Sequence, residues 1–197
     1  MTDKYNNFRD LAAIETEGAD FRIVAKEGRS GLLVVAPHAG RIEIHTSLIA
    51  RAIAGDEHAL YMFEGCKPHG NSALHVTSEH FDEPRCIDLV MRSSLAIGVH
   101  GAAGAGDFII VGGNNNNAKR LVLEALRQFG ATDIGKRHLL GNSPNNICNR
   151  TQDGGVQLEI SLSLRNKLAG TDQRQVSALL TEFRDSIRRA LLEYAQG

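Results

Sequence analysis

The chain has 197 residues, of which 42% are hydrophobic, and this is enough apolar material for one folded core. Its 22 Lys and Arg nearly balance its 23 Asp and Glu, so the formal net charge is −1. Because such a chain has no overall positive field, neither nucleic acid nor an anionic membrane surface is an expected partner.

The sequence also lacks the signals that would direct it to a membrane or out of the cell. Residues 1–21 carry both charge signs and no long apolar core, which argues against a secretory signal. No apolar run approaches the roughly 18 residues of a membrane span. We therefore expect a soluble, cytoplasmic monomer. Its three cysteines form no C-x-x-C pair, so ordinary reduced thiols are expected.

Apolar runs of strand length alternate along the chain with segments of helical periodicity. The predicted strands cover residues 32–36, 59–63, 95–99, 108–111 and 156–164. The predicted helices begin at caps offered by Thr46 or Ser47, by Asp82 and by Asn117, and the last helix covers 171–196. We predict an α/β fold, a single domain over residues 1–197, built as a layered sandwich with a mixed, mostly parallel open sheet flanked by helices.

One long segment, residues 130–155, fits neither a strand nor a helix. It is rich in Gly and Asn and is longer than an ordinary connection in a compact domain. Irregular segments of this length are often functional, so we expect it to cover a site.

Two histidines follow apolar runs at the expected carboxyl ends of strands. His38 follows LLVVAP and His100 follows LAIGV, while Glu43 lies across a glycine turn from His38. Parallel strands would bring these side chains to one sheet edge, where ligands of open α/β sheets bind. Two imidazoles and one carboxylate form a common catalytic zinc set. The alternative is two unrelated polar residues and an acidic charge at a helix start.

Glu159 is the candidate proton carrier. In VQLEISL the apolar residues take every second position, so Gln157, Glu159 and Ser161 share the opposite face of the predicted strand. A carboxylate facing the strand-end crevice could take a proton from an attacking water and return it to a leaving nitrogen. The alternative is a solvent-exposed Glu on an edge strand.

Four segments of the chain together resemble a known family, the poly-γ-glutamate hydrolases of phages and bacilli. They are VVAPHAGRIEIHTSLIARAIAG, LHVTSEHFDEPR, LAIGVHGAAG and NNICNRTQDGGVQLEISLSLR, and the resemblance covers about residues 20–195 in matching order. Members of this family are small zinc enzymes whose fold is related to the zinc carboxypeptidases. The resemblance implies a Zn²⁺ cofactor and a polyanionic poly-γ-glutamate substrate.

Carried over to this sequence, the resemblance implies that His38, Glu43 and His100 bind zinc and that Glu159 is the general base. The spacing departs from the wider carboxypeptidase pattern, in which two residues separate the first His from the Glu. Here four residues separate His38 from Glu43. Terminal-residue specificity is therefore not inherited from the carboxypeptidases.

A polyanionic substrate requires fixed cations at the site, and arginine binds a carboxylate through two hydrogen bonds. The predicted substrate-binding residues are Arg150, Arg165 and Arg41, with His75 and His80 as residues that orient substrate or brace the metal ligands. Each could instead be an ordinary surface or loop residue. The remaining histidines receive no role.

Two other functions remain open from the sequence. One is a zinc amidase or deacylase of the same fold that acts on a small N-acyl amino acid. The other is a non-catalytic module that binds an anionic ligand at the Gly- and Asn-rich edge. If the substrate is an extracellular polymer, a protein without an export signal would reach it after lysis.

Overall fold

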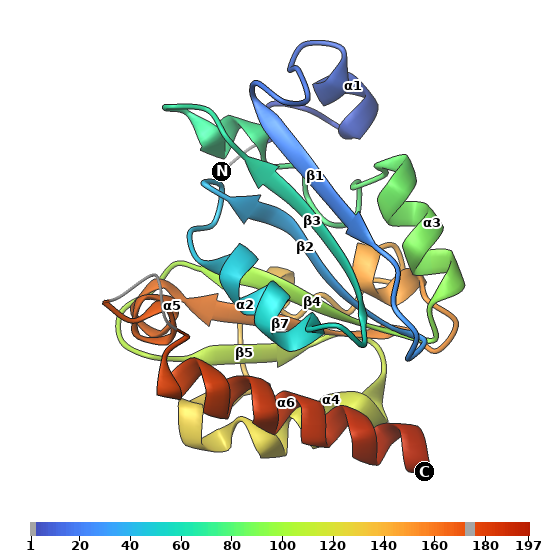
Figure 1. The fold of residues 1–197 in the computed structure, drawn as a ribbon, viewed down its shortest axis with the longest axis vertical. Helices are drawn as coiled ribbons and strands as arrows, with labels where there is room; N and C mark the ends of the chain where they lie inside the picture. Colours follow the sequence, from blue (N-terminus) through green and yellow to red (C-terminus); the bar gives the residue numbers. More distant parts are fainter. Residues whose placement is uncertain (1–2, 172–175) are drawn as a thin grey trace.

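A seven-stranded mixed sheet forms the centre of the computed structural model, which describes residues 3–171 and 176–197 (Figure 1). The strands are β1 (Phe21–Lys26), β2 (Leu32–Gly40), β3 (Ala59–Gly65), β4 (Leu95–Ala102), β5 (Ile109–Gly112), β6 (Ala131–Thr132) and β7 (Gly155–Ser161). Their order in the sheet is β1-β3-β2-β4-β7-β5-β6. The pairs β3–β2, β2–β4, β4–β7 and β5–β6 are parallel, whereas β1–β3 and β7–β5 are antiparallel. The predicted mixed, mostly parallel open sheet is confirmed.

Helices cover both faces of this sheet (Figure 1). They are α1 (Phe8–Ala12), α2 (Thr46–Ala54), α3 (Pro84–Arg92), α4 (Asn116–Ala125), α5 (Leu162–Ala169) and α6 (Ala178–Gln196), with 3₁₀ turns η1 (Asn71–Leu74), η2 (Arg127–Phe129), η3 (Arg137–Leu139) and η4 (Ile147–Arg150). Helices α2, α4, α5 and α6 pack into one core, and α1, α3, η1 and η4 pack into the other. None of the helices described has both the length and the apolarity needed to span a bilayer.

Strand β2 explains why the predicted central strands are continuously apolar. Val34 and Ala36 belong to the core beneath α2 and α6, while Leu33 and Val35 belong to the core beneath α3. Successive side chains of a strand point to opposite faces, so a strand covered on both faces must be apolar at every position. The three-layer arrangement follows directly from this pattern.

Several predicted boundaries differ from the structure. The strand predicted for 156–164 ends at Ser161, and α5 begins at Leu162 because the Ser161 hydroxyl accepts a hydrogen bond from the Leu164 amide at 3.3 Å. Helices α2, α3 and α4 are capped at His45, Glu83 and Asn115 rather than at the residues predicted. Strands β1 and β6 and helix α1 have no counterpart among the predicted elements.

The last predicted helix is confirmed in its central and C-terminal parts. Helix α6 begins at Ala178, where Ser177 caps it, and its buried face carries the predicted apolar residues Leu180, Phe183, Ile187 and Leu191. Part of the predicted beginning, residues 172–175, lies outside the described residues. Val176 precedes the helix and is exposed.

Candidate metal and catalytic site

Three adjacent parallel strands bring the predicted site residues to one edge of the sheet. His38 lies near the end of β2, His100 lies near the end of β4, and Glu159 lies on β7. His100 and Glu159 are direct partners in the β4–β7 register. The pairing of β2 with β3 shifts register between Ala36 and Ala39, around Pro37, which has no amide hydrogen to donate. A register shift of this kind changes the direction of a side chain, here that of His38.

The turn after β2 places Glu43 beside His38. The Glu43 amide donates to the His38 carbonyl at 2.9 Å, which closes the turn. The Oε2 atom of Glu43 then accepts a hydrogen bond from the Gly101 amide at 2.7 Å, so the carboxylate is tied to the end of β4. Glu43 is therefore fixed between β2 and β4.

Nδ1 of His38 lies close to ligand atoms of both other predicted metal ligands. The Nδ1 atom of His38 lies 3.4 Å from Oε1 of Glu43 and 3.2 Å from Nδ1 of His100. The Nε2 atom of His38 must carry a hydrogen, since it lies 2.8 Å from the carbonyl oxygen of Val76, which can only accept. In neutral His38 the Nδ1 atom therefore presents a lone pair to the Glu43 carboxylate. The lone pair of Nδ1 and the negative carboxylate repel each other unless a proton or a metal cation lies between them. The donor set therefore fits a divalent cation such as Zn²⁺.

The charge states of the three residues agree with this arrangement. Burial lowers the pKa of His100 to about 3, so its imidazole is neutral at physiological pH, as a metal ligand must be. Burial also acts to lower the pKa of His38, but the neighbouring Glu43 carboxylate outweighs it and raises that pKa above its ordinary value. Burial acts to raise the pKa of the Glu43 carboxyl, but the nearby His38 acts more strongly in the other direction, so the pKa of Glu43 is lowered. The buried Nε2 of His100 has no hydrogen-bond partner among the residues described.

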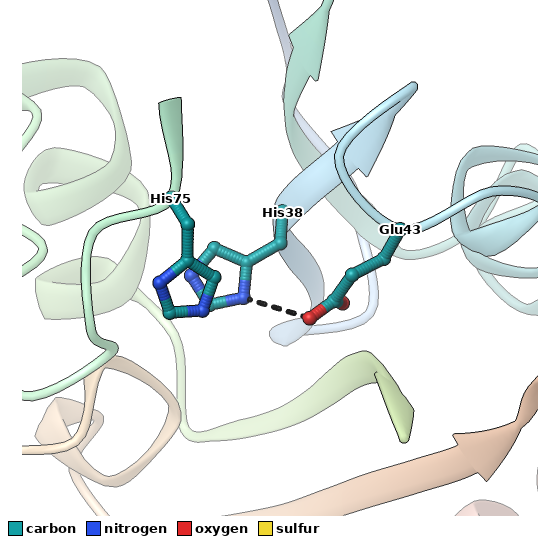
Figure 2. Close-up of side chains that lie close together, drawn as sticks. All are labelled: His38, Glu43 and His75. Atoms are coloured by element: carbon teal, nitrogen blue, oxygen red, sulfur yellow. Dashed lines mark ion pairs between the residues drawn. The ribbon is translucent and has the colours of Figure 1, made fainter. Parts of the chain in front are cut away.

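His75 joins the cluster through the face of the His38 ring. The two rings stack with centroids 3.9 Å apart, while the Glu43 carboxylate lies at the Nδ1 edge of the His38 ring (Figure 2). One possible ligand atom from each of His38, Glu43 and His75 lies within 4.8 Å of the other two. Asp3 orients His75, since its Oδ1 atom lies 2.7 Å from Nδ1 of His75. Among the described residues this is the only group whose ligand atoms meet that limit, so the geometry favours His75 for the third ligand position, whereas the family resemblance implied His100.

Glu159 faces the same cavity as the histidines. Its carboxyl is 7% exposed, and burial, reinforced by the Glu43 charge, raises its pKa to about 8. The side chain of Gln157, on the same strand face, donates to Oε1 of Glu159 at 3.0 Å. The predicted sharing of this face is confirmed, and Glu159 is not a solvent-exposed residue of an edge strand.

A cavity of about 1270 Å³ opens over the cluster. Its floor includes His38, Glu43, His100 and Glu159, and one wall comes from residues 137–146. This wall belongs to the irregular segment 130–155, which accordingly covers a site as predicted. Ser78 and Glu79 also line the cavity, although they are far in sequence from the β7 residues that line it.

The three predicted arginines are not among the residues that line the cavity. Arg165 is 5% exposed and donates to the carbonyls of Ile44 and Ile160. Arg150 binds the carbonyl oxygens of Asn145 and Glu79, so it joins two segments that border the cavity. Arg41 donates to the Lys67 carbonyl. These guanidinium groups hold backbone segments in place.

The histidines predicted to help at the site differ in position. His75 lines the cavity, whereas His80 is exposed and lies outside the lining. His138, which received no role from the sequence, lines it. His75 and His80 lie in the same family-like segment and His138 lies in the irregular segment, so the sequence could not tell which of them reach the cavity.

Other cavity residues carry no local sequence signal that would have identified them. Arg137 lies in η3 and is exposed, and among the described lining residues it is the only guanidinium or ammonium group. Asp3 and Asn146 also line the cavity, although they are far apart in sequence. For Arg137 and Asn146, the sequence indicated only that both lie in the long irregular segment 130–155, which was expected to cover a site.

Comparison with known proteins gives concordant matches over most of the chain. A family model described as poly-gamma-glutamate hydrolase matches residues 5–184. The UPF0714 protein YndL of Bacillus subtilis (strain 168) is 40% identical over 172 residues, which make up 85% of this chain and 68% of YndL. A solved bacteriophage poly-gamma-glutamate hydrolase superposes with a TM-score of 0.92 at 30% identity, over 99% of both chains. A zinc-free apo structure of YndL superposes with a TM-score of 0.91 at 35% identity, over 98% of this chain and 99% of that one.

Proposed function

The chain belongs to the poly-gamma-glutamate hydrolase family, and we propose that it is a zinc-dependent amidohydrolase that cleaves the γ-glutamyl amide bonds of poly-γ-glutamate. The observation that carries the proposal is that Nδ1 of His38 lies 3.4 Å from Oε1 of Glu43 and 3.2 Å from Nδ1 of His100, beside a cavity that Glu159 also lines. The existence of a zinc-free apo structure of YndL supports zinc as the metal.

His38, Glu43 and His100 would hold the metal. Two neutral imidazoles and one carboxylate leave room for water and substrate, which is the composition of a catalytic rather than a structural zinc site. When bound, zinc polarises the scissile carbonyl and lowers the pKa of a water molecule. The Gly101 amide keeps the Glu43 carboxylate oriented by its hydrogen bond to Oε2, which leaves Oε1 on the His38 side.

Glu159 would move the proton. Its Oε1 atom is engaged by Gln157, so the free oxygen, Oε2, takes a proton from the attacking water. The same oxygen then donates that proton to the amide nitrogen as the amine leaves. Burial and the Glu43 charge raise the pKa of Glu159 to about 8, which favours holding the proton until the leaving nitrogen accepts it. A cation bound at Glu43 would lower that pKa and favour the ionised form that takes the proton first.

The cavity favours a polymer over a small N-acyl amino acid. Pockets for drug-sized ligands are about 300–1,000 Å³, and this cavity, at about 1270 Å³, exceeds that range. The wall of residues 137–146 contributes Arg137, whose guanidinium can bind a substrate carboxylate through two hydrogen bonds. Room for more than one glutamyl unit and a fixed cation at the wall suit a polyanionic chain.

The proposal is tested by the size distribution of purified poly-γ-glutamate after incubation with zinc-loaded protein, with and without a zinc chelator. We expect the polymer to shorten, and the chelator to stop the shortening. Unchanged polymer with zinc-loaded protein would contradict the proposed substrate and favour an amidase for small substrates. Unchanged polymer from a protein that takes up no zinc would favour a binding module.

Replacing Arg137 by Ala is expected to weaken substrate binding. Loss of one charge-assisted contact to a carboxylate corresponds to about a 10-fold increase in KM, with kcat changing little. Steady-state kinetics on the polymer measures this, and Arg120→Ala on the exposed face of α4 serves as the control for loss of one positive charge. An equal KM for Arg137→Ala and the unsubstituted protein would remove Arg137 from the binding site.

A further inference from the structure

Gln157 lies at the junction between Glu159 and the cavity wall. It precedes Glu159 by two residues on β7, is 3% exposed, and lines the cavity. Its Nε2 atom donates to Oε1 of Glu159 at 3.0 Å and to the carbonyl oxygen of Leu139 at 3.3 Å. Its Oε1 atom accepts from Nδ2 of Asn146 at 2.7 Å. One buried amide therefore contacts the proton carrier and two residues of the wall.

The surrounding groups allow this amide only one orientation. The Leu139 carbonyl can only accept, so the nitrogen of Gln157 must face it, and the same nitrogen reaches Oε1 of Glu159. Asn146 is fixed in turn, because its Oδ1 atom accepts from the Cys148 amide at 3.2 Å and its Nδ2 atom is left to donate. Reversing either amide would set donors against donors in a buried site, which is costly.

Glu159 is consequently held at one oxygen. Gln157 engages Oε1, and no described residue donates a hydrogen bond to Oε2. A carboxylate held at one oxygen by a buried amide has less rotational freedom, and its second oxygen is left to interact with groups in the cavity. Fixing a reactive group in its productive geometry is a large part of enzymatic rate enhancement.

The wall packs directly on the same amide. A Cβ atom at Gly141, where φ is +54°, would lie 2.4 Å from Oε1 of Gln157, so only glycine allows this approach. Asn149 secures this stretch, since its Nδ2 atom donates to the carbonyls of Gly141 and Ser143, both at 2.7 Å. The position of the wall and the orientation of Glu159 are thus set by shared contacts.

We propose that Gln157 is a positioning residue that orients the Glu159 carboxylate and couples that orientation to residues 139–146 of the cavity wall. This inference rests on the proposed function, because it assigns Gln157 a role in the same reaction. Gln157 acts through Glu159, so its loss affects the chemical step more than substrate binding.

The test is Gln157→Glu, which keeps the side-chain size and replaces the N–H donors by an oxygen. We expect kcat, normalised to bound zinc, to fall about 10- to 100-fold, in line with removal of other supporting hydrogen bonds around a metal site. KM should rise less than kcat falls, the rise coming from repulsion between the added negative charge and a polyanionic substrate. A normalised kcat equal to that of the unsubstituted protein would overturn the proposal, as would an effect confined to KM.

Two further variants guard against misfolding of Gln157→Glu. Asn146→Asp removes the donor to Gln157 but keeps the oxygen that accepts from Cys148, and we expect a smaller loss of kcat in the same direction. Gln128→Glu makes the same amide-to-carboxylate change at an exposed position of η2 and should leave kcat unchanged. If Asn146→Asp retains full kcat, the coupling to the wall is wrong.

Amide hydrogen exchange of the zinc-free protein provides a readout that does not depend on activity. Gln157→Glu removes the donor to the Leu139 carbonyl, so exchange within 139–146 should become faster than in the unsubstituted protein. Unchanged exchange would overturn the coupling. If the unsubstituted protein itself cleaves no polymer, the proposed function fails, while faster exchange would still support the link between Gln157 and the wall.

Discussion

Replacing Glu159 by Gln is expected to leave zinc bound and to lower kcat by about 10²- to 10⁴-fold. The new amide has the same shape, and its oxygen can accept the hydrogen bond that Gln157 donates to Oε1, so the local structure should be preserved. An amide cannot take up a proton from water at neutral pH, so the proton transfer is lost. Single-turnover cleavage of the polymer, together with metal analysis, measures both quantities.

Glu57→Gln is the matched control, because it makes the same change at an exposed position. Its kcat should equal that of the unsubstituted protein. If Glu159→Gln retained zinc and lost less than about 10-fold in kcat, which is below the usual contribution of a general base, another group would have to carry the proton.

Replacing His100 by Ala is expected to remove the metal. The imidazole is buried and neutral, with Nδ1 at 3.2 Å from Nδ1 of His38, and alanine offers no atom to replace it. We expect zinc affinity to fall by more than about 100-fold, since loss of even a supporting partner of a ligand costs about 10- to 100-fold. Zinc titration with a competing chelator measures the change, and it requires no enzymatic activity.

His75→Ala distinguishes the two candidates for the third ligand. If His100 is the ligand, zinc should stay bound when the stacked His75 ring is removed, with at most a moderate loss of affinity. Exposed His69 provides the control for loss of an imidazole. Full zinc occupancy in His100→Ala, combined with loss of zinc in His75→Ala, would transfer the ligand role to His75.

The sequence predicted the sheet well because burial on both faces leaves a strong apolar pattern, as in β2. The predicted strand boundary was wrong where a helix cap ends a strand although the alternation of apolar residues continues. The alternation of Ile160, Leu162 and Leu164 extends the predicted strand, but the Ser161 hydroxyl caps a helix at that point. Strand β1 was missed because much of it is exposed at the sheet edge, where the apolar signal is weak.

The floor of the site was predictable because its residues lie on, or directly after, strands with a strong apolar pattern. His38 and His100 follow apolar runs, and Glu159 stands out on the polar face of β7, so topology brings them together. The cavity wall was not predictable residue by residue. Asp3 and Arg137 reach the cavity through contacts between segments far apart in the chain, and no local pattern encodes such contacts.

The proposed catalytic residues and the proposed substrate-binding residue Arg137 lie on parts of the fold with different tolerance to substitution. His100 and Glu159 are paired across two central strands, where an insertion would shift the register and separate them. In the wall of residues 137–146, exposed positions such as Arg137 belong to a surface connection, and such positions accept substitutions. Gly141 and Asn146 differ from them, because both contact Gln157 and a change at either would also disturb the residue that holds Glu159.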